Sequence, residues 1–310
     1  MESLIGFTGL ALLVLFYLRK YLLRKESPQT QALPFSGELY QVGLACVAKR
    51  SHNGATSTVV VMPGFVENFL YFTEYYADPA IELILLTSAD YHVPVINPRL
   101  TQPKWATAPT ARAGSIAYDA QVLNLALTHL VTTPNVRVHG HSRGGAVTLE
   151  AARQQPALFE QIEVVLEAPV LPQGQPYTPM PALVRWLLPF FLPFWQQQPI
   201  NERNRKIWGP LDNPRKRELI MGVPFNPKRA AIMLANLKDM ADWMPNTGTD
   251  IYQYVKRGAI LVPGDDRVLQ SAAMLASARQ AENLQIIEIE GGSHFVLPDH
   301  PDSIPPLRPN

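Results

Sequence analysis

Short apolar runs alternate with segments of helical periodicity along the middle of this chain. Short, mostly apolar runs at residues 58–62, 162–166 and 259–262 are typical of strands that are covered on both faces of a sheet. Between the first two runs, residues 116–130 have the spacing of an amphipathic helix. Strands that alternate with helices predict an α/β fold with a doubly wound, mostly parallel sheet.

Other parts of the chain carry a weaker strand pattern. Residues 38–48 alternate imperfectly and predict early strands, and residues 93–97, 135–139 and 284–289 are each predicted to be a strand. A helix is expected over residues 146–155, directly after a glycine-rich turn. We assign all of these strands to the same sheet.

The alternation is interrupted over residues 172–257. This stretch contains an apolar segment broken by prolines at 181–195 and a helical segment at 227–243. We interpret it as a cap that is inserted into the α/β core and lies over the sheet. The core is then formed by residues 38–171 and 258–310.

The N-terminus is strongly apolar. Residues 4–18 contain no charged residue and no proline, and Arg19 and Lys20 follow directly. Because a bilayer core needs about 20 residues of helix, a span requires that the helix continue past this basic pair, whose side chains must then reach the headgroups. We predict a single-pass membrane anchor over residues 1–25 and a polar linker over 26–37.

The orientation of this anchor follows from its basic residues. By the positive-inside rule, the basic cluster after the apolar segment places the rest of the chain in the cytoplasm. A cleaved signal peptide is one alternative, but it needs positive charge before the apolar run, where Glu2 lies instead. An ordinary buried helix is the other alternative. The cluster consists of Arg19, Lys20, Arg24 and Lys25.

Composition and charge exclude several classes of function. The formal net charge is +1 and the basic residues are not gathered into one long run, which gives no case for nucleic-acid binding. Cys46 is the only cysteine, so neither an intrachain disulfide nor a cysteine-based metal site is possible. Hydrophobic residues make up 47% of the 310 residues, which is enough for a sizeable core.

The strongest chemical motif is GHSRGG at residues 140–145, between a predicted strand and a predicted helix. Nucleophilic catalysis by serine needs a hydroxyl on a sharp turn, and small flanking residues let the chain make that turn. Ser142 is therefore the candidate nucleophile. The alternative is a glycine-rich turn in which the serine has no chemical role.

A serine hydroxyl needs a neighbouring base, and the chain contains seven histidines. His294 follows the last predicted strand, on a loop able to reach the carboxyl edge of the sheet, and is the candidate base. His139 and His141 flank the turn at Ser142, and we interpret them as packing residues. The other histidines have no supporting context: His52, His92, His129 and His300.

The base in turn needs a carboxylate that fixes its tautomer. Asp265 and Asp266 both follow the predicted strand at 259–262, and one of them is expected to cap the turn. Glu167, at the end of the strand at 162–166, is a third candidate. We favour Asp266, on grounds of family resemblance given below.

Acyl transfer also needs backbone N–H groups directed at the developing oxyanion. One donor is expected from Arg143, the residue after the candidate nucleophile. The second is expected from Phe65, in the sequence PGF at residues 63–65 after a predicted strand. Considered alone, this loop fits an ordinary turn with a core aromatic residue equally well.

Together these motifs resemble the α/β-hydrolase superfamily, particularly its lipase, esterase and monoacylglycerol-lipase-like branch. The resemblance covers residues 38–300 except the cap, and the order Ser, Asp, His is that of the family. It implies Asp266 as the acid, because an acid two residues before valine is the usual form of this turn. Pro63 is a departure, since many relatives carry histidine there.

The resemblance implies a serine hydrolase that cleaves carboxylic esters through an acyl-serine intermediate, without a cofactor or metal. The anchor and the apolar segment at 181–195 favour a lipid ester; this segment lines an acyl pocket, contacts the bilayer surface or packs as a cap helix. An acyltransferase on the same scaffold is one alternative. A non-catalytic membrane-anchored scaffold is another. Nothing in the sequence indicates the oligomeric state.

Overall fold

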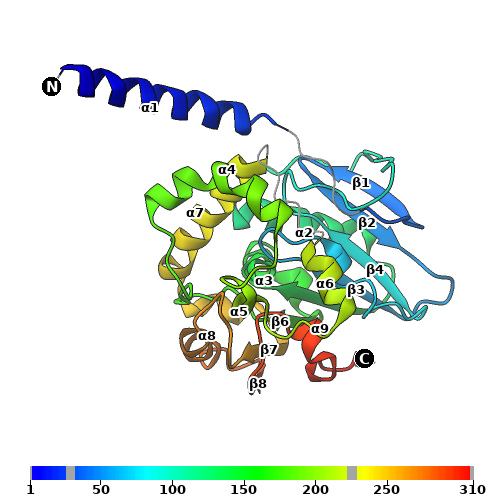
Figure 1. Cartoon of the computed structure of the whole chain (residues 1–310). Helices are drawn as coiled ribbons and strands as arrows, with labels where there is room; N and C mark the ends of the chain where they lie inside the picture. Colours follow the sequence, from blue (N-terminus) through cyan, green and yellow to red (C-terminus); the bar gives the residue numbers. More distant parts are fainter. Residues whose placement is uncertain (1, 26–31, 222–228, 308–310) are drawn as a thin grey trace.

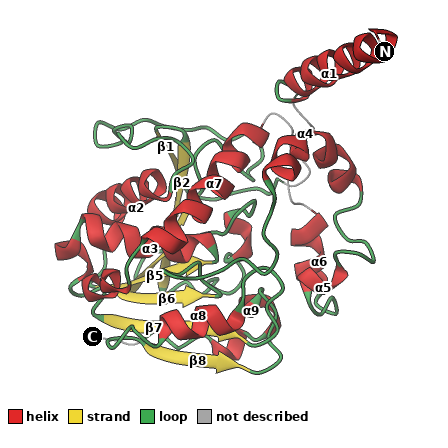
Figure 2. Ribbon diagram, turned by 90° about the vertical axis from the view of Figure 1, so that its left-hand side faces the viewer, coloured by secondary structure: helices red, strands yellow, loops and turns green. Residues whose placement is uncertain are grey.

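A computed structural model describes residues 2–25, 32–221 and 229–307 of the chain. These residues contain one eight-stranded sheet, whose strand order is β1-β2-β4-β3-β5-β6-β7-β8 (Figures 1 and 2). β1 pairs with β2 and β2 with β4 in antiparallel fashion, and every other pair is parallel. The predicted α/β fold with a mostly parallel sheet is confirmed.

The strands are short and mostly buried. Their bounds are β1 Glu38–Val42, β2 Ala45–Arg50, β3 Ser57–Met62, β4 Ile81–Leu86, β5 Asn135–His141, β6 Glu163–Glu167, β7 Arg257–Pro263 and β8 Gln285–Ile289. The α-helices are α1 Glu2–Leu22, α2 Ile116–Leu130, α3 Arg143–Gln154, α4 Ala182–Gln197, α5 Arg205–Trp208, α6 Pro214–Met221, α7 Ala230–Asn246, α8 Ser271–Ala278 and α9 Val296–Asp299. Short 3-10 helices lie at η1 Phe69–Tyr71, η2 Pro156–Phe159, η4 Thr249–Tyr254 and η5 Pro301–Ser303.

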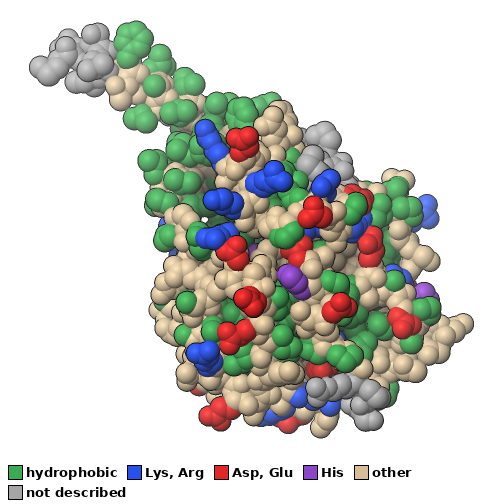
Figure 3. Space-filling model, turned by 60° about the horizontal axis from the view of Figure 1, so that its bottom comes forward, with side chains coloured by type: hydrophobic (Ala, Val, Ile, Leu, Met, Phe, Trp, Pro, Cys, Tyr) green, Lys and Arg blue, Asp and Glu red, His purple; other side chains and the backbone are tan. Residues whose placement is uncertain are grey.

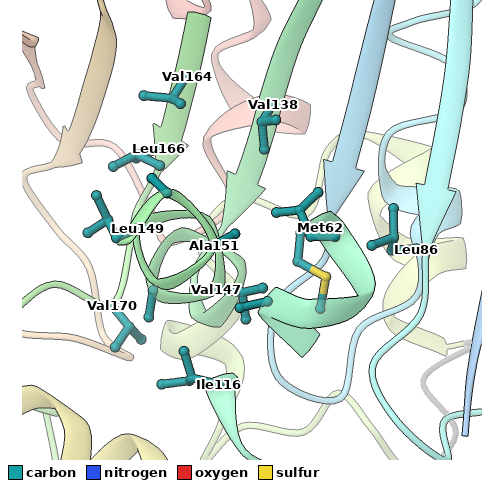
Figure 4. Packing of buried hydrophobic residues seen from close by; sticks show 14 of the residues in the cluster. Met62, Leu86, Ile116, Val138, Val147, Leu149, Ala151, Val164, Leu166 and Val170 are labelled. Atoms are coloured by element: carbon teal, nitrogen blue, oxygen red, sulfur yellow. The ribbon is translucent and has the colours of Figure 1, made fainter. Parts of the chain in front are cut away.

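The strand residues divide between two apolar layers. In β3, Val60 and Met62 pack under α2 and α3, and Val59 and Val61 belong to a second cluster on the opposite face, with η1 and α9. Figure 4 shows the first layer around α3. Because both faces of β3 are covered, its sequence is a continuous apolar run rather than an alternating one.

One strand prediction is wrong, and one strand of the structure was not predicted. Residues 93–97 are not a strand, and Val95 makes only an isolated bridge to Leu33. The strand that the sheet contains in this part of the chain is β4, an apolar run that was not predicted to be a strand. Pro94 and Pro98 flank the isolated bridge, and proline lacks the N–H that a strand ladder requires.

The predicted N-terminal helix is present as α1, which projects away from the rest of the protein (Figure 1). No helix within the described residues is long and apolar enough to cross a membrane, so the predicted span is not supported. Half of the predicted linker, residues 26–31, lies outside the described residues.

Helices α4 to α7 lie between β6 and β7 in the chain, at the place of the predicted cap. The apolar segment at 181–195 forms α4, a continuous helix in spite of Pro189 and Pro193. Leu188 and Leu192 of α4 pack against Val66 and Met233. Residues 222–228, which include the predicted start of the helical segment at 227–243, lie outside the described residues.

Candidate active site

The candidate site lies at one edge of the sheet. β3, β5, β7 and β8 run parallel, so their carboxyl ends meet at the same edge. Phe65, Ser142, Asp266 and His294 follow these four strands in turn. The topology therefore brings together residues that are far apart in the sequence.

Ser142 occupies a strained turn between β5 and α3. Its backbone has φ 52° and ψ −117°, a conformation that L-residues rarely adopt outside functional sites. Gly144 permits this turn, because a Cβ there would lie 2.0 Å from the carbonyl oxygen of Met62. The Ser142 N–H donates to the carbonyl oxygen of Glu167 (2.9 Å). The hydroxyl is thus presented at the start of α3 with its backbone held by the neighbouring strand.

His294 and Asp266 form a buried pair. The distance between His294 Nδ1 and Asp266 Oδ2 is 2.6 Å, and Asp266 Oδ1 accepts the N–H groups of Val268 (2.7 Å) and Leu269 (2.9 Å). Burial opposes the charged carboxylate, but the His294 ring and the two N–H groups outweigh it and lower the pKa of Asp266. With Nδ1 donating to an ionised carboxylate, His294 Nε2 is left as the acceptor.

The two other candidate acids lie elsewhere. The Asp265 side chain is 58% exposed and forms an ion pair with Arg267 (2.5 Å). Glu167 is fully buried and contacts His139 Nε2 (3.1 Å) rather than His294. Among the three carboxylates proposed from the sequence, Asp266 is the one in hydrogen-bond contact with the His294 ring.

The loop after β3 comes close to Ser142. A Cβ added to Gly64 would lie 3.0 Å from Ser142 Cβ, so a side chain at this position would crowd the nucleophile turn. Among the described residues, neither the Phe65 N–H nor the Arg143 N–H donates a hydrogen bond to the protein. Both predicted oxyanion donors therefore remain available to a ligand.

The Arg143 side chain, by contrast, is fully buried. Its guanidinium contacts Asp119 Oδ2 (2.5 Å) and Ser88 Oγ (3.3 Å). This ion pair fastens the first turn of α3 to α2. Arg143 thus offers its backbone, and not its charge, to the candidate site.

A cavity of about 230 Å³ opens beside Ser142 and His294. Phe65 and Tyr71 line it from the core, and Trp208, Lys216 and Ile220 line it from the cap. Residues 181–195 do not line this cavity. Ser142 Oγ and His294 Nε2 share the cavity without a hydrogen bond between them in this structure, a geometry that unliganded sites often show before substrate closes it.

A model of the alpha/beta hydrolase family matches residues 59–304. The chain belongs to the alpha/beta hydrolase family. The matched segment of this alpha/beta hydrolase includes all four loops of the candidate site. No curated protein matches the chain in sequence.

Solved structures of similar fold come from several enzymes. An esterase from Exiguobacterium antarcticum has a TM-score of 0.59 at 13% identity, over 86% of this chain and 96% of its own. The 2-hydroxy-6-oxo-6-phenylhexa-2,4-dienoate hydrolase of Rhodococcus sp. strain RHA1 has a TM-score of 0.60 at 15% identity, over 86% and 94%. The N-formylmaleamic acid deformylase of Pseudomonas putida S16 has a TM-score of 0.58 at 12% identity, over 86% and 98%. At these identities the likeness of the alpha/beta hydrolase to them is one of fold.

Sequence reasoning missed several polar residues of the site. Glu67 and Lys216 line the cavity, and neither was singled out. Lys216 comes from α6 and forms a buried ion pair with Asp299 (2.7 Å). His141 was interpreted as a packing residue, yet both of its ring nitrogens form hydrogen bonds. The available signal was position in the sequence: Glu67 lies two residues after the predicted oxyanion donor Phe65, and His141 directly precedes the candidate nucleophile.

Proposed function

We propose that this alpha/beta hydrolase is a serine hydrolase that cleaves carboxylic esters through an acyl-serine intermediate. The observation that carries the proposal is the buried pair of His294 and Asp266, whose histidine shares a cavity with a serine held on a strained strand-to-helix turn. A non-catalytic scaffold has no need for such a turn, because backbone strain of this kind destabilises the fold.

The first half of the reaction forms the acyl-enzyme. Ser142 Oγ attacks the ester carbonyl carbon while His294 Nε2 takes its proton, and Asp266 stabilises the resulting imidazolium. The N–H groups of Phe65 and Arg143 bind the oxyanion of the tetrahedral intermediate. As the intermediate collapses, the carbon–oxygen bond to the alcohol breaks and His294 returns the proton to the leaving alkoxide.

The second half regenerates the serine. Water attacks the acyl carbon, His294 takes a proton from the water, and Ser142 leaves with that proton as the free carboxylic acid departs. An acyltransferase would instead pass the acyl group to an alcohol or thiol. The two activities share every residue named above and differ in the acceptor.

The cavity indicates an apolar substrate of modest size. Its lining includes the rings of Phe65, Trp208 and Phe295 and the side chain of Ile220. Its volume of about 230 Å³ is below the roughly 300–1,000 Å³ of pockets that bind drug-sized ligands. We therefore propose a short or medium acyl chain, and the resemblance to the monoacylglycerol-lipase-like branch stays a prediction.

A series of p-nitrophenyl esters tests this proposal. We expect hydrolysis of the butanoate and octanoate esters at kcat/KM values at least about tenfold above that of the hexadecanoate ester, a difference of about 1.4 kcal/mol. Chromatography of the products in the presence of glycerol distinguishes transfer from hydrolysis. Free acid as the main product supports the hydrolase, and acylglycerol as the main product replaces it by the acyltransferase.

We further propose that α1 and the exposed face of α4 contact a lipid surface. The apolar side chains of α1 stand out from the body of the protein in Figure 3. Arg19 joins the two helices, because its guanidinium donates to the Trp186 carbonyl oxygen (3.0 Å) and lies over the indole ring. On α4, Leu183 and Phe194 are 67% and 70% exposed. The cytoplasmic position of the catalytic domain stays a prediction.

Vesicle co-sedimentation tests this contact. Deleting residues 2–25 is expected to lower binding to phosphatidylserine vesicles by more than about a hundredfold, and Leu183→Ser with Phe194→Ser also by at least about a hundredfold, because burying one such side chain contributes about 1.5–3 kcal/mol and about 1.4 kcal/mol is a factor of ten. Leu44→Ser, at an exposed position of the β1–β2 turn, is the matched control. Equal binding by all of these variants contradicts the proposed contact.

A further inference from the structure

His141 lies between two acceptors. Its Nδ1 is 2.8 Å from Glu67 Oε2, and its Nε2 is 2.9 Å from the carbonyl oxygen of His294. A backbone carbonyl only accepts, and so does an ionised carboxylate. A neutral imidazole has one N–H, so it satisfies one of these contacts and leaves two acceptors facing each other at the second. The geometry therefore fits the imidazolium form of His141.

The other charged and titratable groups around His141 favour the same form. Glu167 is a fully buried carboxylate that receives the Tyr71 hydroxyl (2.6 Å) and the Leu297 N–H (2.7 Å). The Tyr71 ring stacks on His141 with centroids 4.7 Å apart, and the His294 ring lies 4.9 Å away. His139 sits between the Tyr76 hydroxyl and Glu167. The carboxylates of Glu67 and Glu167 therefore both lie near the His141 ring, which can carry a compensating positive charge.

The pKa values agree with this geometry. Burial opposes the charged form of His141, but the charges of Glu67 and Glu167 outweigh burial and raise its pKa to about 9. Burial likewise opposes ionisation of Glu167, and the charge of His141 with the hydrogen bonds of His139 and Tyr71 lowers the pKa of Glu167 to about 2. Burial lowers the pKa of His139, which therefore stays neutral.

This ion pair touches three loops of the site. Glu67 Oε2 also accepts the N–H of Gly64 (2.6 Å), the residue before the oxyanion donor Phe65. His141 is the residue before Ser142, and its second N–H binds the backbone of His294. The oxyanion loop, the nucleophile turn and the histidine loop are therefore joined through one carboxylate and one ring.

We propose that Glu67 and His141 are positioning residues, whose ion pair holds the oxyanion loop and the histidine loop in register around Ser142. This inference rests on the serine hydrolase function proposed above. Neither side chain exchanges a proton with substrate. Their role is to fix the Phe65 N–H and the His294 ring at the distances that the tetrahedral intermediate requires.

The kinetic test uses Glu67→Gln in the full chain. The substituted amide still accepts hydrogen bonds but lacks the negative charge, so we expect kcat to fall by about tenfold with KM changed by less than about twofold, since misplacement by 1 Å costs on the order of a hundredfold. Glu160→Gln, at an exposed glutamate, is the matched control and retains wild-type kcat.

The pH profile separates positioning from general destabilisation. Because the pKa of His141 is raised, the ion pair is present below pH 9 and is lost as the pH rises through about 9, where wild-type kcat is expected to fall. In Glu67→Gln, burial still lowers the pKa of His141, but one of the two neighbouring carboxylates that raise this pKa is gone. The alkaline fall in kcat therefore moves to lower pH, and an unmoved profile overturns the proposal.

Two measurements without turnover keep this test independent of the proposed function. ¹⁵N NMR of histidine-labelled Ser142→Ala protein is expected to show both His141 nitrogens protonated at pH 7.5, and a neutral ring overturns the proposal. Hydrogen exchange by mass spectrometry is expected to speed up in residues 63–68 and 292–296 of Glu67→Gln and not of Glu160→Gln; equal exchange also overturns it. Absence of esterase activity in wild type, with both signatures present, contradicts the hydrolase and leaves the ion pair in place.

Discussion

Replacing Ser142 by alanine is expected to lower kcat for p-nitrophenyl butanoate by about 10⁶-fold, to near the residual rate that binding and oxyanion contacts alone support. The substitution removes the attacking oxygen and leaves the cavity unchanged. The fold should survive, because the Ser142 backbone makes the hydrogen bonds to Glu167 and Val170 that hold the turn. Initial rates and a thermal melt of the same preparations measure both effects.

The matched control is Ser36→Ala, at an exposed serine outside the sheet. It is expected to retain wild-type kcat and the wild-type melting temperature. If Ser142→Ala is well folded and keeps more than about a hundredth of the activity, Ser142 is not the nucleophile, because loss of a single attacking group costs far more than this.

Asp266→Asn is expected to lower kcat by about 10⁴-fold. The amide removes the charge that stabilises imidazolium, and it presents a donor to His294 Nδ1, which favours the wrong tautomer. Burial makes this effect large, because Asp266 is 3% exposed and solvent cannot replace its charge. The measurement is kcat for the same ester, with folding checked by circular dichroism.

Asp265→Asn is the matched comparison, one residue away. Asp265 is exposed and paired with Arg267, and exposed ion pairs contribute about 0–1 kcal/mol to stability. Its kcat should stay within about threefold of wild type, a difference of less than about 1 kcal/mol. A larger loss in Asp265→Asn than in Asp266→Asn would reverse the assignment of the acid.

The positions of most parallel strands along the chain were predictable from the sequence. β3 and the centre of β6 are buried and apolar at successive positions, a pattern that differs from the periodicity of α2. β5 alternates apolar and polar residues, but it directly precedes the glycine-rich turn. β4 is just as apolar as β3, but the strand was predicted at residues 93–97 instead, where prolines interrupt the apolar residues. A local pattern does not show whether neighbouring prolines leave enough N–H groups for a ladder.

The loops of the candidate site were predictable because each follows a strand end, and parallel strands place those ends together. The order of motifs therefore led to Ser142, Asp266 and His294, which the structure places in or beside one cavity. The polar network behind them was not predictable, since contacts such as those of Glu67 with His141 join residues 74 positions apart. Such a contact depends on how two loops pack against each other, and the spacing of residues in the sequence does not show this.

Helices α4 to α7 lie where the sequence predicted a cap, but their contacts were not predictable. Its apolar segment suggested an acyl pocket, whereas α4 packs on α7 through Leu188 and Leu192 and leaves its other face exposed. The cavity is instead lined from the cap by Trp208, Lys216 and Ile220. Which face of an apolar helix meets the core depends on the partner helix, and two proline-containing turns hide the periodicity that would indicate it.

Whether Ser142 is an activated nucleophile is tested most directly by measuring the mass of the chain after treatment with a fluorophosphonate. This probe phosphonylates a serine only when a base activates it and an oxyanion site binds its oxygen. We expect one adduct per chain, located by peptide mapping at Ser142, and no adduct in Ser142→Ala or after denaturation. Absence of an adduct in folded wild-type protein, or an adduct at another residue, would contradict this expectation.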